Sequence, residues 1–309
     1  MFGSNTQKGK KLTPFRRKEA RAFYLTISPW LIGFVLLTVG PMLYSLYISF
    51  TRYDLLSPPE WAGLYNYLEK MPNDARFWQS LKVTAIYTAA YVPLEMIGGL
   101  MLALLVRERV RGIKVFRTIF YLPTVLAGVA FAVVWLLLLN PRGGLANLGL
   151  KAVGINGPRW LLDPDWALFS LLLMSFWGWG RAMVIYLAGL QSIPGEIYEA
   201  AAIDGASRWD SFWRITIPML SSTIFFNLIL SVIGTFQTFT NAFVATDGGP
   251  LDATLFFVLY LYKQGFDLRN MGYASALAWV LFVIILVFTL LIFRSQEFWV
   301  FYAGEKTDE

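Results

Sequence analysis

The stretch MGYASALAWVLFVIILVFTLLIF, residues 271–293, contains no charged side chain and is almost wholly apolar. A helix needs roughly 20 such residues to cross the hydrocarbon core of a bilayer. This stretch is therefore long enough to span a membrane once. It predicts a membrane protein rather than a water-soluble one.

Five further apolar runs of similar length precede it. Together they predict six transmembrane helices, at about residues 24–50, 79–106, 115–139, 166–193, 219–245 and 271–293. We therefore expect an all-α membrane protein with one six-helix domain over residues 23–294, between a basic tail (1–22) and a second tail (295–309). The first run is too long for a cleavable signal peptide, and no small-residue cleavage site follows it.

The composition agrees with this fold class. Hydrophobic residues make up 57% of the 309 residues and charged residues 15%, whereas soluble domains carry about 25% charged residues. Cysteine and histidine are both missing, which excludes disulfides, thiolate metal sites and the commonest general base and metal ligand. We expect no enzyme activity, no metal site and no cofactor in this chain.

The lysine and arginine residues indicate the orientation. About twice as many lie in the two tails and in the loops at 107–117 and 208–214 as in the remaining loops. Because cytoplasmic loops are enriched in these residues, we expect both termini in the cytoplasm. The net charge of +6 then reflects orientation beside membrane lipid, and we expect no binding to nucleic acid.

A hydrophilic segment, QSIPGEIYEAAAIDGASRWDSFWRITIPML, separates the fourth and fifth predicted helices at residues 191–220. Strong helix formers at 199–202 follow Pro194 and Gly195, and Gly205 can supply the left-handed residue that ends a short helix. The residues alone support two interpretations equally. One is an amphipathic helix resting on the headgroups, and the other is a docking element for a cytoplasmic partner.

The same segment resembles the EAA loop of bacterial ABC-importer permeases. The resemblance lies in Glu199-Ala200-Ala201, Asp204-Gly205-Ala206, Phe212 and Ile215-Thr216-Ile217-Pro218. Other stretches resemble the carbohydrate branch of that family, as in maltose, oligosaccharide and glycerol-3-phosphate systems: residues 23–34, 53–54, 63–67, 116–123, 187–194, 248–250 and 271–274. The resemblance implies a type I ABC-importer permease in the bacterial cytoplasmic (inner) membrane, forming half of the path for a sugar or sugar derivative.

The resemblance also implies partners. These are a second, homologous permease in a heterodimer, two copies of a cytoplasmic ATPase subunit, and an extracytoplasmic solute-binding protein. The coupling loop, about residues 194–218, would seat in the ATPase with Glu199, Ala200, Ala201, Asp204 and Gly205 at its core. ATP and Mg²⁺ would bind to that partner, since this chain has no GxxxxGKS or GxxxxGKT phosphate loop.

A polar stripe runs along the fifth predicted helix. Spacings of three and four place its members on one face: Thr223, Asn227, Ser231, Gly234, Thr235, Thr238 and Asn241. Such a face either packs helices together or lines a cavity whose hydroxyls and amides suit sugar hydroxyls. We favour the cavity for the stripe as a whole. The resemblance implies substrate contacts at Ser231 and Thr235.

The fourth predicted helix is interrupted at residues 177–181, WGWGR. Trp177 offers an aromatic platform for a sugar ring, and the paired glycines at 178 and 180 loosen the helix. Trp177, Gly178 and Arg181 are assigned to the predicted substrate path.

Arg181 lies near the middle of a predicted span, where an arginine costs at least about 2.5 to 3.5 kcal/mol. Glu95, at mid-depth in the second predicted helix, is its candidate partner. Two hypotheses compete. We favour a buried Arg181–Glu95 ion pair over an Arg181 that faces the cavity and meets an anionic or highly hydroxylated substrate.

The loops at 51–78, 140–165 and 246–270 are long and predicted to lie on one side, which suggests a docking surface. The resemblance supplies the solute-binding protein as partner, with residues 247–250 leading a loop toward it. The alternative function is an ion-coupled secondary sugar transporter. That class usually shows inverted repeats and buried acidic or histidine proton carriers, and the sequence offers mainly Glu95.

Overall fold

The computed structural model describes residues 14–107, 112–125 and 128–301. Most of the predicted basic tail and part of the second tail therefore lie outside the described residues, as do positions 108–111 and 126–127. The orientation argument used basic residues at several of these positions: Lys8, Lys10, Lys11, Arg109, Arg111 and Lys306.

The long helices lie where the apolar runs predict them. The first run forms α1 (Pro14–Phe34), a π-helical turn η1 (Val35–Val39) and α2 (Gly40–Ser49), and the second forms α3 (Ala75–Arg107). The fifth forms α12 (Ser221–Phe236) and α13 (Thr240–Ala245), and the sixth forms α15 (Met271–Trp299). By length and composition, four described segments can cross a membrane: Lys18–Ser49, Ala75–Arg107, Ser221–Ala245 and Met271–Trp299.

The third and fourth predicted helices are each divided. α4 (Ile113–Val125) and α5 (Gly128–Leu138) lie at 103° to each other. α7 (Pro164–Ser175) passes through a 3-10 turn, η4 (Phe176–Gly178), into α8 (Gly180–Ser192), with a bend of 41°. The described chain therefore has four candidate spans, or up to six if each bent pair counts as one. The second bend lies at the predicted interruption, whereas the sequence did not indicate the first.

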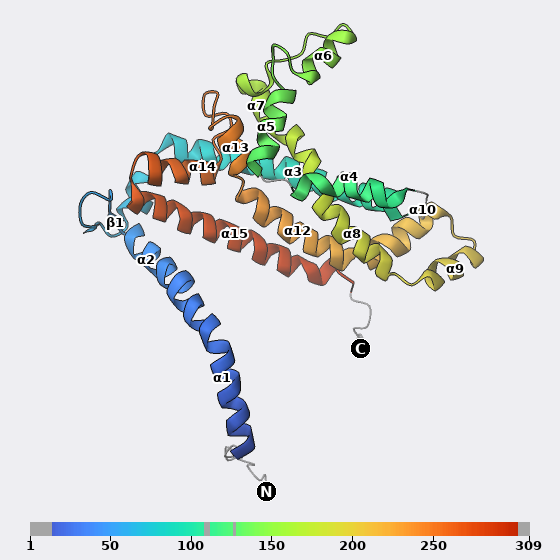
Figure 1. Cartoon of the computed structure of the whole chain (residues 1–309), viewed down its shortest axis with the longest axis horizontal. Helices are drawn as coiled ribbons and strands as arrows, with labels where there is room; N and C mark the ends of the chain where they lie inside the picture. The colour runs from blue at the N-terminus through green and yellow to red at the C-terminus, as the bar shows by residue number, and fades with distance from the viewer. Residues whose placement is uncertain (1–13, 108–111, 126–127, 302–309) are drawn as a thin grey trace.

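Figure 1 shows how the helices are arranged. α3, α12 and α15 run through the body of the molecule, where α3 packs against α8 and α12 lies between α3 and α15. The α1–α2 segment diverges from this body, and its main contacts are those of α2 with α15. On another side, α5 and the short helix α6 (Leu145–Ala152) project away from it.

Small residues allow α3 and α8 to approach closely. A methyl group on Gly99 of α3 would lie 2.7 Å from the β-carbon of Ala182 in α8, and one on Gly98 would overlap the indole of Trp179. Gly189 of α8 faces Thr223 of α12 in the same way. Contacts of this kind are typical of helix packing in membranes. They hold together the three helices that carry most of the predicted path.

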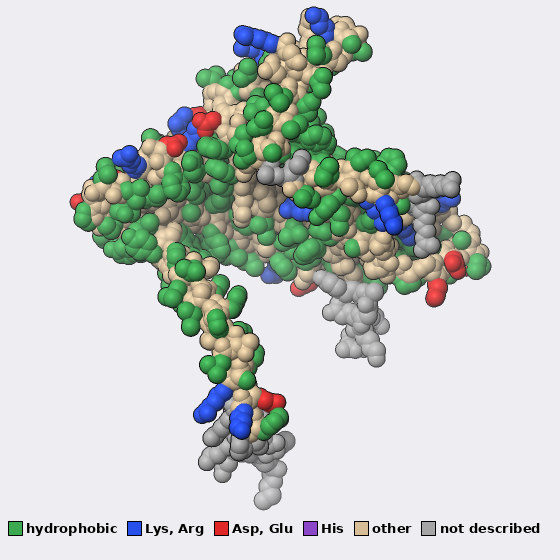
Figure 2. Space-filling view, viewed as in Figure 1, with side chains coloured by type: hydrophobic (Ala, Val, Ile, Leu, Met, Phe, Trp, Pro, Cys, Tyr) green, Lys and Arg blue, Asp and Glu red, His purple; other side chains and the backbone are tan. Residues whose placement is uncertain are grey.

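Two ends of the body carry short elements. At one end, β1 (Thr51–Arg52) pairs antiparallel with β2 (Glu60–Trp61), beside η2 (Asn66–Lys70), α14 (Phe257–Tyr262) and η6 (Lys263–Asp267). A further 3-10 turn, η3 (Trp160–Leu162), precedes α7. At the other end lie α9 (Gly195–Ile203), α10 (Arg208–Ser211), η5 (Phe212–Thr216) and α11 (Ile217–Met219). Figure 2 shows apolar side chains over most of the visible body and charged groups gathered toward its extremities.

Candidate functional sites: a polar cavity and an exposed loop

A polar cavity of about 290 Å³ lies among α3, α5, α8 and α12. Its walls are formed by Tyr87, Tyr91, Pro123, Gly128, Phe131, Ser175, Gly178, Arg181, Ser231, Gly234, Thr235, Thr238 and Asn241. Most of the polar groups in these walls are hydroxyls. Arg181 is the one charged side chain among the lining residues.

The predicted polar stripe divides between the two roles considered for it. Ser231, Thr235 and Thr238 line the cavity, as the cavity interpretation expects. Asn227 does not: it is buried, and its side-chain amide donates to the carbonyl oxygen of Thr223 at 3.3 Å. Thr223 itself packs against Gly189. Thr223 thus packs α12 against α8, Asn227 bonds within its own helix, and the part of the stripe nearer α13 faces the cavity.

Trp177 does not line the polar cavity, although the next residue, Gly178, does. Its indole lies in a neighbouring, mainly apolar pocket of about 510 Å³, at 6.0 Å from the ring of Phe131 and 5.4 Å from that of Trp135. The 3-10 turn at 176–178 has about three residues per turn, which rotates the side chain off the face expected for a continuous α-helix. The prediction from the sequence treated this segment as one continuous α-helix.

Glu95 and Arg181 lie side by side but in different surroundings. A terminal nitrogen of Arg181 is 3.8 Å from Oε1 of Glu95, and the two side chains are 56% and 3% exposed, respectively. The other carboxylate oxygen of Glu95 accepts a hydrogen bond from Ser231 Oγ at 2.5 Å. The geometry therefore combines the two hypotheses for Arg181: it is close to Glu95, and it also reaches the cavity.

The predicted coupling loop contains the expected short helix. α9 begins after Pro194, and Gly205, with φ of +84°, follows its end in the left-handed conformation. Glu199, Ala200, Asp204 and Gly205 are exposed, and Ala201 is half-buried. The loop thus presents most of the predicted contact residues to its surroundings.

The opposite side of α9 is anchored to the body. The Tyr198 hydroxyl lies 2.9 Å from Thr216 Oγ1, and the Arg107 guanidinium lies 5.0 Å above the Tyr198 ring. These contacts join α9 to η5 and to the end of α3. A force on α9 therefore reaches the end of α3 directly and reaches α12 through η5 and α11.

A capping box that the sequence analysis missed begins α10. Ser207 Oγ accepts from the Asp210 backbone N–H at 3.1 Å, and the Asp210 carboxylate accepts from the Ser207 N–H at 3.2 Å. Hydrogen bonds from the Ser207 side chain and backbone lower the pKa of Asp210. The Ser-x-x-Asp spacing was the available signal, since this pattern is related to the S/T-x-x-E box at helix starts.

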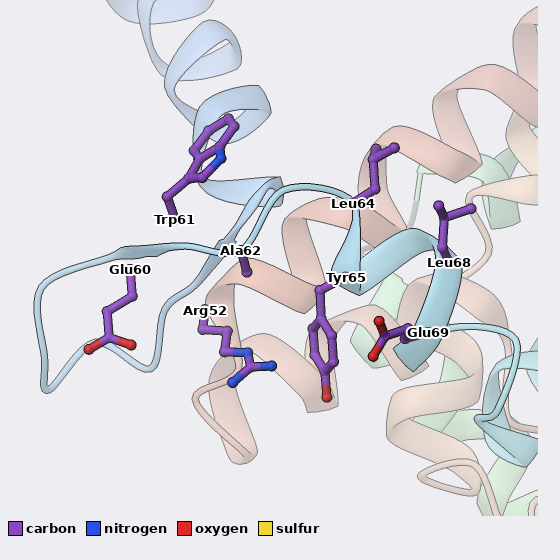
Figure 3. Close-up of a pocket in the computed structure, with 8 residues that line it drawn as sticks. All are labelled: Arg52, Glu60, Trp61, Ala62, Leu64, Tyr65, Leu68 and Glu69. Carbon is purple, nitrogen blue, oxygen red and sulfur yellow. The ribbon is translucent and has the colours of Figure 1, made fainter.

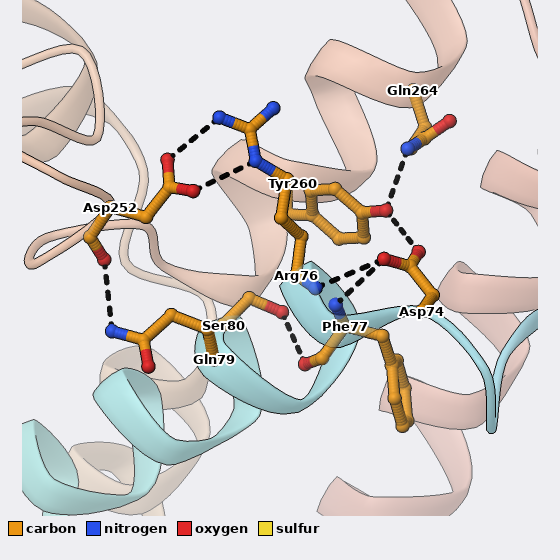
Figure 4. Close-up of polar contacts among 8 residues, drawn as sticks. All are labelled: Asp74, Arg76, Phe77, Gln79, Ser80, Asp252, Tyr260 and Gln264. Carbon is orange, nitrogen blue, oxygen red and sulfur yellow. Dashed lines mark hydrogen bonds and ion pairs between the residues drawn. The ribbon is translucent and has the colours of Figure 1, made fainter.

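Contacts at the other end of the body join two of the three predicted outer loops (Figure 4). Arg76 Nε and a terminal nitrogen donate to the two carboxylate oxygens of Asp252 at 2.8 and 2.9 Å. Asp74 accepts from the backbone N–H of Arg76 at 3.0 Å and from the hydroxyl of Tyr260. Burial, with the contact to Asp74, raises the pKa of Tyr260. The loop that contains α6 takes no part in this network.

A surface pocket of about 490 Å³ lies beside the β1–β2 hairpin (Figure 3). Arg52, Tyr65 and Glu69 project toward one side of it, whereas Trp61 projects toward the other. The Arg52 guanidinium lies 4.2 Å above the Tyr65 ring. Nearby, burial lowers the pKa of Lys70, and the charge of Asp74 acts in the opposite direction. None of these residues was among the site residues predicted from the sequence.

The described residues contain no group of three or more His, Cys, Asp or Glu side chains that could hold a metal ion.

Comparisons with known proteins agree on the type of chain. Residues 95–299 match the family described as binding-protein-dependent transport system inner membrane component. The chain is 43% identical to the probable ABC transporter permease protein YesP of Bacillus subtilis, over 99% of this chain and 100% of that protein. It is 35% identical to the trehalose/maltose transport system permease protein MalF of Thermococcus litoralis, over 91% and 95% of the two chains.

A solved structure shares the fold. It is a crystal structure of a bacterial ABC transporter involved in the import of the acidic polysaccharide alginate, matched with a TM-score of 0.80 over 91% of this chain and 96% of that chain. The sequence identity is 23%, so the likeness is one of fold.

Proposed function

The chain belongs to the family of binding-protein-dependent transport system inner membrane components, and from this premise we propose that it is a permease subunit of an ATP-driven importer for a sugar or sugar derivative. Like its permease relatives, it is a transport subunit and not an enzyme. The proposal includes a multi-pass protein of six spans in the bacterial cytoplasmic (inner) membrane, with both termini in the cytoplasm. Relatives named as lactose, trehalose/maltose and sn-glycerol-3-phosphate permeases support the substrate class.

The observation that carries the proposal is α9. Its end at Gly205 is defined, its Tyr198 side is anchored, and its Glu199 and Asp204 side is exposed without an ion-pair partner in the described part of the chain. A short rigid helix transmits movement better than a flexible loop does. We propose that this side binds one of two ATPase subunits, which hold the ATP and Mg²⁺, and that α9 passes their closure to α3 and α12.

The polar cavity is proposed as this chain's half of the translocation path. A second, homologous permease would supply the other half. The α1–α2 segment supports such a partner, because only 6% of its most apolar window is buried within the chain. An apolar helix left uncovered by its own chain suits a neighbouring permease together with lipid.

An extracytoplasmic solute-binding protein is the proposed partner at the β1–β2 end. The structural neighbour that was solved with a pentasaccharide-bound periplasmic protein supports a partner of this kind. The Arg76–Asp252 contact joins the loops after α2 and α13 into one surface there. A docking protein can thus act on both loops together.

The coupling proposal is tested by Gly205→Asp and by the double variant Glu199→Lys, Asp204→Lys, each in the full chain with its partner subunits. Both are expected to lower sugar uptake and ATPase co-purification while the permease remains inserted. Glu297→Lys, an exposed charge reversal on α15, is the matched control. Wild-type uptake together with unchanged ATPase co-purification in the α9 variants would refute the coupling role.

The ion-coupled secondary transporter is separated from this proposal by its energy source. Proteoliposomes that contain this chain alone are expected to show no sugar transport driven by an ion gradient. Transport without an ATPase would require the secondary transporter instead.

A further inference from the structure

We propose that the cavity recognises an acidic saccharide, one that carries a carboxylate, and that Arg181 binds this carboxylate. The inference rests on the proposed function, because it takes the cavity to be the saccharide's path. It narrows the substrate from sugars in general to sugars that contain a uronic acid.

The Arg181 guanidinium is exposed and has free hydrogen-bond donors. It is 56% exposed and, among the described residues that line the cavity, it is the one charged group. Its distance of 3.8 Å from Glu95 exceeds that of a hydrogen bond, and none of its five N–H donors is bonded to a described residue. Donors left free in the wall of this cavity are available to a ligand.

The charge that compensates Arg181 is the carboxylate of Glu95, and it lies outside the cavity. Glu95 is 3% exposed and does not line the cavity, and Ser231 donates to one of its oxygens. The carboxylate therefore lies behind the wall, where it offsets the cost of placing an arginine inside the bundle. The cavity surface presents the positive member of the pair, and the negative member is covered.

Glycines in the cavity wall leave space around the Arg181 guanidinium. Gly234 lies beside it: a β-carbon built on that glycine would be 3.8 Å from the terminal nitrogen of Arg181. Gly178 leaves a second section of the wall without a side chain. Thr235, Thr238 and Asn241 line the same cavity and can bond sugar hydroxyls. The site thus joins one charged group to several neutral donors and acceptors.

The charge of the cavity wall suits a carboxylate better than a phosphate. A guanidinium forms bidentate pairs with carboxylates and with phosphates, so charge separates the two ligands, and a carboxylate carries one negative charge. A phosphate monoester carries about −1.5 to −2 charges at neutral pH. One arginine would leave part of that charge unbalanced, and the described wall provides no second cation. A neutral saccharide would leave the arginine donors unused, which a polar site penalises.

The test measures uptake by the complete importer, with its native partner subunits, in membrane vesicles supplied with ATP. The probes are digalacturonate, its dimethyl ester and maltose. Arg181→Gln is expected to lower the ratio of digalacturonate to ester uptake by roughly tenfold or more, because a charge-assisted bond is lost. Arg181→Lys should retain part of the ratio, and Arg294→Gln, an exposed arginine on α15, should leave it unchanged.

The double variant Arg181→Gln, Glu95→Gln guards against a simple folding defect, since it leaves no unpaired buried carboxylate. It should insert normally and still lose the preference for digalacturonate. ATP-dependent uptake of only the ester or maltose by the wild type, or equal losses for all probes in both variants, would overturn the inference and leave the proposed function intact. No ATP-dependent uptake of any probe would instead count against the proposed function itself.

Discussion

The hydroxyl of Ser231 donates a hydrogen bond to the buried carboxylate of Glu95 across the contact between α12 and α3. The single hydroxyl proton is thereby used inside the protein. Ser231 can therefore only accept hydrogen bonds from a substrate in the cavity. Its lone pairs suit a sugar hydroxyl, while Arg181 offers the donors.

Removing that hydroxyl should destabilise the helix contact. Ser231→Ala leaves one oxygen of buried Glu95 without its partner, and we expect a loss of about 1 to 3 kcal/mol in the free energy of unfolding. Thermal unfolding in detergent measures it. Ser192→Ala, an exposed hydroxyl bonded within its own helix, should change stability by less than about 0.5 kcal/mol. Equal effects of the two variants would contradict the role given to Ser231.

The close approach of α3 and α8 predicts a sharp size limit at Gly99. A methyl group there would lie 2.7 Å from Ala182 Cβ, so Gly99→Ala must push the helices apart. We expect a cost of about 1 to 3 kcal/mol, visible as a lower melting temperature in detergent.

The matched control for Gly99→Ala is Gly149→Ala in α6. That glycine is helical, exposed and has open space around it. Alanine there should be neutral or stabilise α6 by up to about 1 kcal/mol. If Gly99→Ala were as well tolerated as Gly149→Ala, close packing at Gly99 would not be a constraint.

The Arg76–Asp252 pair should contribute little at high salt. Its side chains are 58% and 30% exposed, so water and ions screen the attraction. A double-mutant cycle with Arg76→Gln and Asp252→Asn is expected to give a coupling energy of about 0.2 to 1 kcal/mol at low salt. The coupling should fall as salt is raised. A value that 1 M salt, about 3 Å of screening length, does not reduce would mean that a buried contact is responsible.

The capping box of α10 should depend on pH in one direction. Because hydrogen bonds lower the pKa of Asp210 in the folded protein, the ionised cap is complete above the ordinary pKa of an aspartate. It is lost as the pH falls through the lower, folded pKa. Hydrogen-exchange protection of the Asp210 amide should therefore decrease at acidic pH. Asp210→Asn, which does not titrate, should show no such step.

Hydropathy alone located the long helices, because spanning length and apolarity are local properties of the chain. The bend near residue 179 also had a local signal in its paired glycines. The angle between α4 and α5 had no such signal. Apolarity predicts that a segment is shielded from water, but it does not predict the direction of the helix axis. The same limit explains Trp177, whose direction depends on a 3-10 turn that the pattern did not indicate.

The polar contacts between distant segments were beyond sequence reasoning for a different reason. Arg76 and Asp252 are 176 positions apart, and only the folded chain brings them together. Glu95 and Arg181 could be named as candidate partners because charge is costly and rare in spanning helices, and they lie 3.8 Å apart. Ser231, by contrast, gave no indication that its hydroxyl is bonded to Glu95.

The position of Glu95 on α3 has a consequence for biosynthesis. The ribosome delivers Glu95 to the membrane well before Arg181, so α3 first meets lipid with an acid that has no counter-charge. A lone acid is costly in lipid, so such a segment is favoured to wait in the insertion machinery until α8 emerges. Since Gly98 and Gly99 shape α3 for contact with α8, the two segments are suited to leave that machinery as a pair.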